Sequence, residues 1–145
     1  MPRPTVTSVH TEIKAALIAA GVYAVDGPAD DLPSEFETTV DGFPVRIGGV
    51  VRQAAVLWPS PGFHTYTRVS GASSGRVDRV LITCVGATTF DALAVADAVE
   101  ATLGGLRLSG GDVLRQTLVT QPSPEPNADP RLVSLAVEYT TITKG

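Results

Sequence analysis

The chain has 145 residues, of which 43% are hydrophobic and 18% charged, and its formal net charge is −4. This length suits one domain with a real core, and the negative charge argues against general affinity for nucleic-acid phosphates, which requires clustered Lys and Arg. The low charged fraction indicates a partly apolar surface, suited to burial against partners. A GC-rich gene would produce the same bias, since only Lys14 and Lys144 are lysines, so both explanations stay open.

Cellular location is constrained by the cysteine count and by the N-terminus. The single cysteine, Cys84, cannot form an internal disulfide or a cysteine-based metal site, and its place in a β-branched run predicts a buried thiol. The opening Met-Pro-Arg-Pro lacks the apolar segment of a secretory signal, and no run approaches the roughly 18 apolar residues of a membrane span. We therefore expect a soluble protein, made in the cytoplasm, with no membrane partner.

The first predicted element is a helix that Thr7 or Ser8 caps and that Gly21 ends in a left-handed conformation. Apolar residues recur along it at helical spacing, namely at Val9, Ile13, Ala16, Leu17 and Ala20. Residues 22–25 are typical of a short strand. Residues 26–35 are rich in turn formers and predict a loop.

The next region is predicted to be β-rich. Asp41-Gly42 and Gly48-Gly49 are typical of hairpin turns. They separate short strands that we expect at 36–40, 43–47 and 50–58. Pro44 restricts the middle strand to an edge or an extended arm. Residues 59–75 predict a loop that is mobile or ordered by a partner; Trp58 and Phe63 flank its Pro-rich start, and Trp58 either anchors a partner or closes the core.

The clearest pattern is a strand, a tight turn and a helix over residues 80–105. Val80–Val85 reads as a strand covered on both faces, and Gly86 ends it. Thr88 with Asp91 resembles a capping box, so the helix should begin at Thr88 or Thr89. Its single apolar stripe contains Ala92, Val95, Ala96, Val99 and Leu103. Gly104-Gly105 ends the helix, and the near absence of reactive groups points to assembly rather than catalysis.

After this helix, residues 106–108 and 113–120 predict two strands. Residues 121–130 contain four prolines and predict an extended loop. The closing strand alternates, with Val133, Leu135, Val137 and Tyr139 on one face and Ser134, Ala136, Glu138 and Thr140 on the other. The order of elements predicts an α+β fold over residues 1–145, with two helices packed on one face of a mainly antiparallel sheet.

Reactive side chains do not form a recognisable site. His10 and His64 lack partners at metal-ligand spacing, and His10 is expected to be a solvated surface residue. Asp30-Asp31 is expected to be a solvated turn, and the glycine pairs are expected to be turns rather than phosphate cradles. Ser73 lacks the strand and helix that flank a nucleophile elbow. The sequence therefore predicts no catalytic, cofactor-binding or metal-binding residues.

Several segments together resemble a known family. They are Leu57–Gly62, the Ser/Gly-rich loop after it, Leu81–Gly86, the helix containing Ala94–Val99 and ending at Leu103-Gly104, and the late strand with Tyr139. The chain resembles small tail proteins of long-tailed phages of actinobacteria, and among these it is most similar to the tail terminator, or tail completion, family. The similarity covers residues 12–142 and is sharpest over residues 57–104.

The resemblance implies an α+β subunit that assembles as a homohexameric ring at the head-proximal end of the tail tube of a virion. Its implied partners are further copies of itself, the tail tube protein and the head-tail connector or neck protein, while DNA passes through the lumen without specific binding. It implies no enzyme activity and no cofactor. The loops at 26–37, 59–75 and 121–130 would be ordered by neighbouring subunits.

Two alternatives stay open. Residues 36–51 depart from the compact members of the family, so the chain could be a neighbouring neck protein or another minor tail protein of the same virion. The other class is a small-molecule-binding or enzymatic α+β domain with the 59–75 loop as a lid, which would need a pocket with convergent polar groups. A bacterial interaction protein unrelated to phages would share the same composition.

Overall fold

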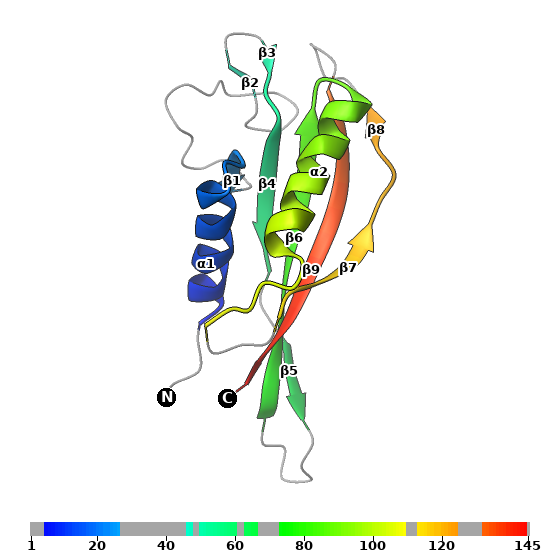
Figure 1. Cartoon of the computed structure of the whole chain (residues 1–145). Helices are drawn as coiled ribbons and strands as arrows, with labels where there is room; N and C mark the ends of the chain where they lie inside the picture. Colours follow the sequence, from blue (N-terminus) through cyan, green and yellow to red (C-terminus); the bar gives the residue numbers. More distant parts are fainter. Residues whose placement is uncertain are drawn as a thin grey trace.

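The computed structural model describes residues 5–26, 46–47, 50–60, 63–66, 73–109, 113–124 and 132–144. Two helices lie on one face of a seven-stranded sheet (Figure 1). This arrangement confirms the predicted α+β class.

Helix α1 (Val6–Ala19) begins earlier than the sequence indicated. Its cap is Thr5, whose hydroxyl oxygen accepts a hydrogen bond from the Ser8 amide at 3.0 Å, so the predicted caps Thr7 and Ser8 are wrong. Ser8 instead uses its own hydroxyl to donate to the Thr5 carbonyl at 2.9 Å. The predicted stop is confirmed, because Gly21 has a φ of 85°.

The main sheet is mostly antiparallel. Its strand order is β1 (Ala24–Asp26), β4 (Ala54–Pro59), β6 (Ser73–Gly86), β9 (Val133–Lys144) and β7 (Arg115–Val119). Two further strands extend it, β5 (Phe63–Tyr66) beside β6 and β8 (Ser123–Pro124) beside β9. Only the β1–β4 pair is parallel among the described strands. A separate pair, β2 (Arg46–Ile47) with β3 (Val50–Val51), is antiparallel and joins Ile47 to Val50 across the predicted Gly48-Gly49 turn.

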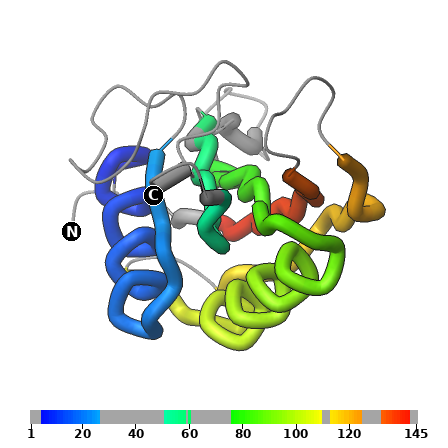
Figure 2. The backbone as a smooth tube through the Cα atoms, turned by 90° about the horizontal axis from the view of Figure 1, so that it is seen from above, coloured from blue at the N-terminus to red at the C-terminus, as the bar shows by residue number. Residues whose placement is uncertain are grey.

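Helix α2 (Thr89–Leu103) begins where the sequence predicted. The Thr88 hydroxyl accepts the Asp91 amide at 3.2 Å, and Gly104 caps the other end. Viewed along the sheet, α2 lies beside α1, and β7 and β8 lie beyond α2 on the side away from α1 (Figure 2).

The main core lies between the helices and the sheet. The predicted face of β9 is confirmed, since Val133, Leu135, Val137 and Tyr139 are all buried there. The inner stripes of α1 and α2 supply most of the opposing surface, with Val9, Ile13, Leu17, Ala92, Val95, Val99 and Leu103 buried. Tyr139 is fully buried and is the bulkiest side chain in this layer. Packing of the helices on this face accounts for the alternation that the sequence displays.

A second, smaller cluster covers part of the opposite face of the sheet. It consists of Val25, Val51, Ala54, Val56, Val85 and Leu132, with Tyr23 and Trp58 packed against it. Val85 is therefore buried as predicted for a strand covered on both faces, whereas Leu81 and Thr83 on the same face are only half-buried. The Trp58 indole donates to the Thr83 hydroxyl at 3.0 Å, and this contact favours the core-closing role over the partner-anchoring one.

Strand boundaries differ from the sequence-based expectation where pairing is non-local. Part of the expected 59–75 loop is β5 and the start of β6, which form a hairpin that extends beyond both helices (Figure 1). No helix packs against this hairpin, so its sequence lacks the alternation of apolar and polar residues that predicts a half-buried strand. The expected strand over 50–58 is interrupted at Arg52-Gln53, and the one at 106–108 reduces to a single bridge between Arg107 and Val113.

The remaining loop predictions are partly tested. Within 121–130, Ser123–Pro124 is strand β8 rather than loop, and residues 125–130 lie outside the described residues. The predicted strand at 36–40, the Asp41-Gly42 turn and all but the first residue of the 26–37 loop also lie outside them.

The turn between β6 and α2 requires glycine at position 86. A Cβ atom added to Gly86 would lie 2.5 Å from the Asp91 Cβ and 2.7 Å from the Ala92 backbone nitrogen. We expect Gly86→Ala to lower the free energy of unfolding by about 1–3 kcal/mol, because the backbone must shift to admit the methyl group. Urea unfolding measures this, with Ala87→Ser at the exposed neighbouring position as the control; equal loss in both variants would contradict the close approach.

Candidate functional site

Three polar clusters stand out within the described residues, and two of them link a helix to the sheet. The first joins α1 to β1: His10 Nε2 lies 2.6 Å from Asp26 Oδ1, and Lys14 Nζ lies 2.8 Å from Asp26 Oδ2. The side chain of His10 is only 15% exposed, so the predicted solvated histidine is wrong. The sequence could not reveal this role, since its partner lies 16 residues away.

The ionisation of Asp26 reflects this cluster. Burial raises the pKa of the Asp26 carboxyl, but hydrogen bonds from Lys14 and His10, with their charges, outweigh it and leave the pKa below its usual value of 3.8. The carboxylate therefore stays charged and holds α1 against the β1 edge. This is a structural clamp rather than an acid–base pair facing a cleft.

The second cluster ties α2 to β9 and β7. The Tyr139 hydroxyl donates to the Glu100 carboxylate and accepts a hydrogen bond from Gln116 Nε2 at 3.1 Å. Burial raises the pKa of Tyr139, and the neighbouring Glu100 raises it further, so the hydroxyl remains a protonated donor. Sequence alternation placed Tyr139 in the core but did not indicate its partners, although a buried tyrosine hydroxyl usually has one.

The third cluster is an ion pair on β6. Arg76 Nε lies 2.5 Å from Asp78 Oδ1, and Arg76 Nη2 lies 3.0 Å from Asp78 Oδ2. Both side chains are buried, and their i, i+2 spacing places them on one face of the strand. The paired geometry satisfies two charges near the point where the β5–β6 hairpin leaves the domain.

The remaining candidates from the sequence do not converge on a site. Cys84 is buried as predicted, and burial raises the pKa of its thiol to about 12. Ser73 is the first residue of β6, outside any strand-turn-helix elbow, while Asp30-Asp31 lies outside the described residues, as do the side chains of Phe63 and His64. In the part of the chain that the structure describes, no group of three potential ligands could hold a metal ion. Neither described helix is long and apolar enough to cross a membrane.

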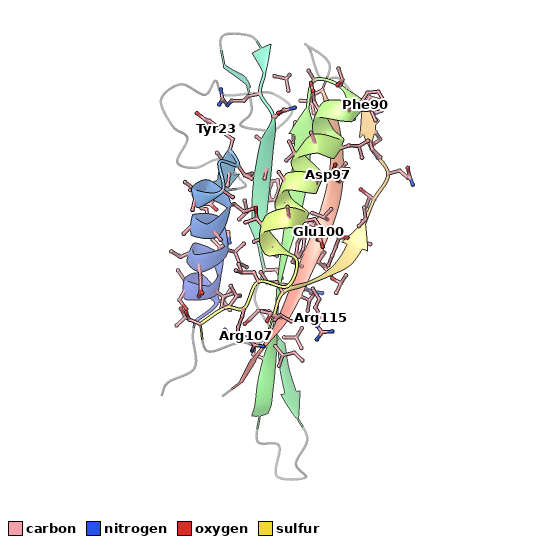
Figure 3. All side chains as sticks on the ribbon, in the orientation of Figure 1. Tyr23, Phe90, Asp97, Glu100, Arg107 and Arg115 are labelled. Atoms are coloured by element: carbon pink, nitrogen blue, oxygen red, sulfur yellow. The ribbon has the colours of Figure 1, made fainter. Side chains whose placement is uncertain are left out.

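The outward surface of α2 is unusually apolar. Phe90 is 82% exposed and Leu93 is 38% exposed, at the first turns of the helix. The other exposed positions of this helix after Phe90 are Ala94, Asp97, Ala98, Glu100 and Ala101. We call this set, Phe90 to Ala101, the α2 outer face; Figure 3 shows Phe90 and Asp97 along it. A helix that is apolar on its inner and outer sides is normally covered on both.

A groove lies beside this face, between α2 and the end of α1. Its volume is about 380 Å³. It is lined by Ala20, Gly21, Val22, Tyr23, Arg52, Gln53, Ala54, Ala94, Val95 and Ala98, and we call it the α1–α2 groove. The Arg52 guanidinium carbon lies 3.9 Å from the centroid of the Tyr23 ring, a cation–π contact that fixes a positive charge at the groove.

The sheet also has an open edge at β7. Within the described residues, β7 pairs only with β9, and all five of its side chains are exposed. Leu118 is 46% exposed and Val119 is 59% exposed. An apolar edge with free backbone groups is a template for another strand, so this edge is a second surface suited to assembly. The bulge at Thr117 shifts the register between Gln116 and Leu118 and so divides the edge into two short regular parts.

The α1–β1 clamp predicts a specific dependence of stability on pH. Because the pKa of Asp26 is lower in the folded chain, its contribution is present above about 3.8 and is lost as the pH falls further. We expect Asp26→Asn to cost about 0.5–1 kcal/mol at pH 7, since the carboxylate is half exposed, and the difference from the parent to shrink below pH 4. Thermal unfolding from pH 2 to 7 measures it, with Asp97→Asn as the control; a constant difference would contradict the clamp.

Comparisons with known proteins give a fold relationship. No protein-family model matches the chain, and no curated protein is significantly similar to it. Among solved structures, it is similar to a chain in the virion of a native gene transfer agent particle, with a TM-score of 0.52 and 19% sequence identity. The match covers 90% of this chain and 84% of that chain. The two chains therefore share a fold over most of their length.

Proposed function

We propose that this protein is a structural subunit of a phage-type virion. Within that class, it acts as a tail terminator: a homohexameric ring at the head-proximal end of the tail tube that docks to the head connector. Two lines of support come from different sources, the fold shared with a chain of a gene transfer agent virion and the resemblance of residues 57–104 to tail terminator proteins.

The observation that carries the proposal is the α2 outer face. Phe90 is 82% exposed, and Asp97 and Glu100 are the charged residues among the exposed positions of the helix. Leaving such a surface in water forfeits the free energy of apolar burial, and isolated soluble domains rarely present it as a continuous strip. This cost disappears when the α2 outer face is buried against another subunit.

The polar clusters support the same reading. Two of them join structural elements, α1 to β1 and α2 to β9 and β7, and the third is an ion pair within β6. Catalysis needs titratable groups that converge on a space where a substrate can sit. His10, Asp78 and Tyr139 line one cavity, but its volume of about 10 Å³ is no more than a single water molecule needs. The architecture thus favours a rigid building block over a small-molecule enzyme.

The remaining partners follow from this role. One rim of the ring would contact the tail tube protein and the other the connector or neck protein, while DNA would pass through the lumen. The net charge of −4 fits a channel of this kind, because a basic lining would hold the duplex through its phosphates.

Ring formation tests the proposal directly. We expect negative-stain electron microscopy of the purified protein, alone or mixed with tail tubes, to show rings seated at one end of each tube. Mass photometry should show a species about six times the 15.0 kDa subunit mass. A strict monomer at high concentration that also fails to bind tail tubes would overturn the proposal.

A further inference from the structure

The two surfaces beside each other on the helical face differ in charge. Helix α2 carries Asp91, Asp97 and Glu100 and no basic residue, and Asp97 occupies the middle of its outer face. The α1–α2 groove instead presents Arg52, exposed and held over the Tyr23 ring. Figure 3 shows Asp97 on α2 and Tyr23 on the α1 side of the molecule. The outer face carries acidic charge, whereas the groove has a mixed polar and apolar lining with a fixed cation; the two surfaces share Ala94 and Ala98 along one side of α2.

We propose that the α2 outer face of one copy seats in the α1–α2 groove of a second copy, with Phe90 entering the groove and Asp97 facing Arg52. This inference rests on the proposed function, since it names the contact that joins the copies. The occupant is a second copy because the charge and shape that complement the groove are present on the chain itself.

The groove is large enough to admit an aromatic ring. An apolar cavity of ~150 Å³ accepts a benzene molecule, and the groove has a volume of about 380 Å³. Its floor and walls include small apolar side chains, which let a bulky ring approach the backbone: Ala20, Val22, Ala54, Ala94, Val95 and Ala98. An exposed aromatic side chain that becomes buried against a second copy has the features of an interface hot spot.

The spacing along α2 allows both contacts at once. Seven residues separate Phe90 from Asp97, which is nearly two helical turns, so they share one side of the helix about 10.5 Å apart. Arg52 is pre-organised by its stacking on Tyr23, and a guanidinium held in place loses less freedom when it pairs with a carboxylate. The ring anchors the contact, and the charge pair orients it.

The experiment exchanges the two charges. Asp97→Arg and Arg52→Asp are each expected to weaken self-association at least about tenfold in sedimentation velocity on the full chain, because each places like charges together. The double variant should restore association to within about threefold of the parent. Phe90→Asp should weaken association without rescue by either change.

Two control variants match these substitutions in chemistry but lie elsewhere. Arg79→Asp reverses an exposed arginine on β6, and Ile142→Asp changes an apolar side chain on β9 that is 46% exposed. Both are expected to associate like the parent. Circular dichroism confirms that each variant folds, which exposed positions should permit.

The outcomes separate this inference from the proposed function. Rings that form equally in all variants, or a double variant no better than either single one, would overturn the inference while the ring function stands. Charge-dependent pairs that never form rings on tail tubes would support the contact and overturn the ring. If Phe90→Asp blocks binding to tail tubes but leaves self-association intact, the α2 outer face serves the tube, and the inference fails.

Discussion

The close approach between the β6–α2 turn and the first turn of α2 sets the geometry of this fold. Gly86 admits the backbone of Ala92 so closely that any side chain there would collide with it, and the Thr88 cap fixes where the helix begins. From that point, Val95, Val99 and Leu103 descend onto the sheet, and Glu100 reaches Tyr139 at the far end. The same docking determines which side of α2 faces outward. Placement of the inner stripe therefore decides the exposure of Phe90.

Local sequence signals were sufficient to predict several helix ends and one buried strand face. The boundaries of α2, the stop of α1 at Gly21 and the buried face of β9 each depend on residues within a few positions, so caps, glycine and alternation were sufficient. These signals failed where pairing joins distant segments. Strand β5 forms by pairing with β6, and His10 contacts Asp26, which lies 16 residues away in the chain. The local sequence around β5 or around His10 does not indicate either partner.

The candidate site shows a related limit. The stripe of small apolar residues was read as the inner side of a scaffold helix, and burial of Ala92, Val95 and Val99 bears that out. A helix rich in alanine on all sides, however, does not reveal from its sequence that Phe90 and Leu93 stay exposed after the inner side is packed. Likewise, Arg52 and Tyr23 lie far apart in the chain and meet only because β1 pairs with β4. A surface formed by segments that lie far apart in the chain can be identified only once the fold is known.

The open β7 edge has a consequence for the proposed assembly. An edge strand with two exposed apolar residues offers the same backbone groups to any extended segment, so its pairing is not limited to one partner. Contacts through a shaped groove select one partner and can close on themselves, whereas sheet extension has no natural end. If the groove is occupied first, the proposed assembly closes on itself; if the β7 edge pairs first, extension of the sheet can lead to aggregation. Synthesis of the protein together with its proposed partners would favour the closed assembly over aggregation.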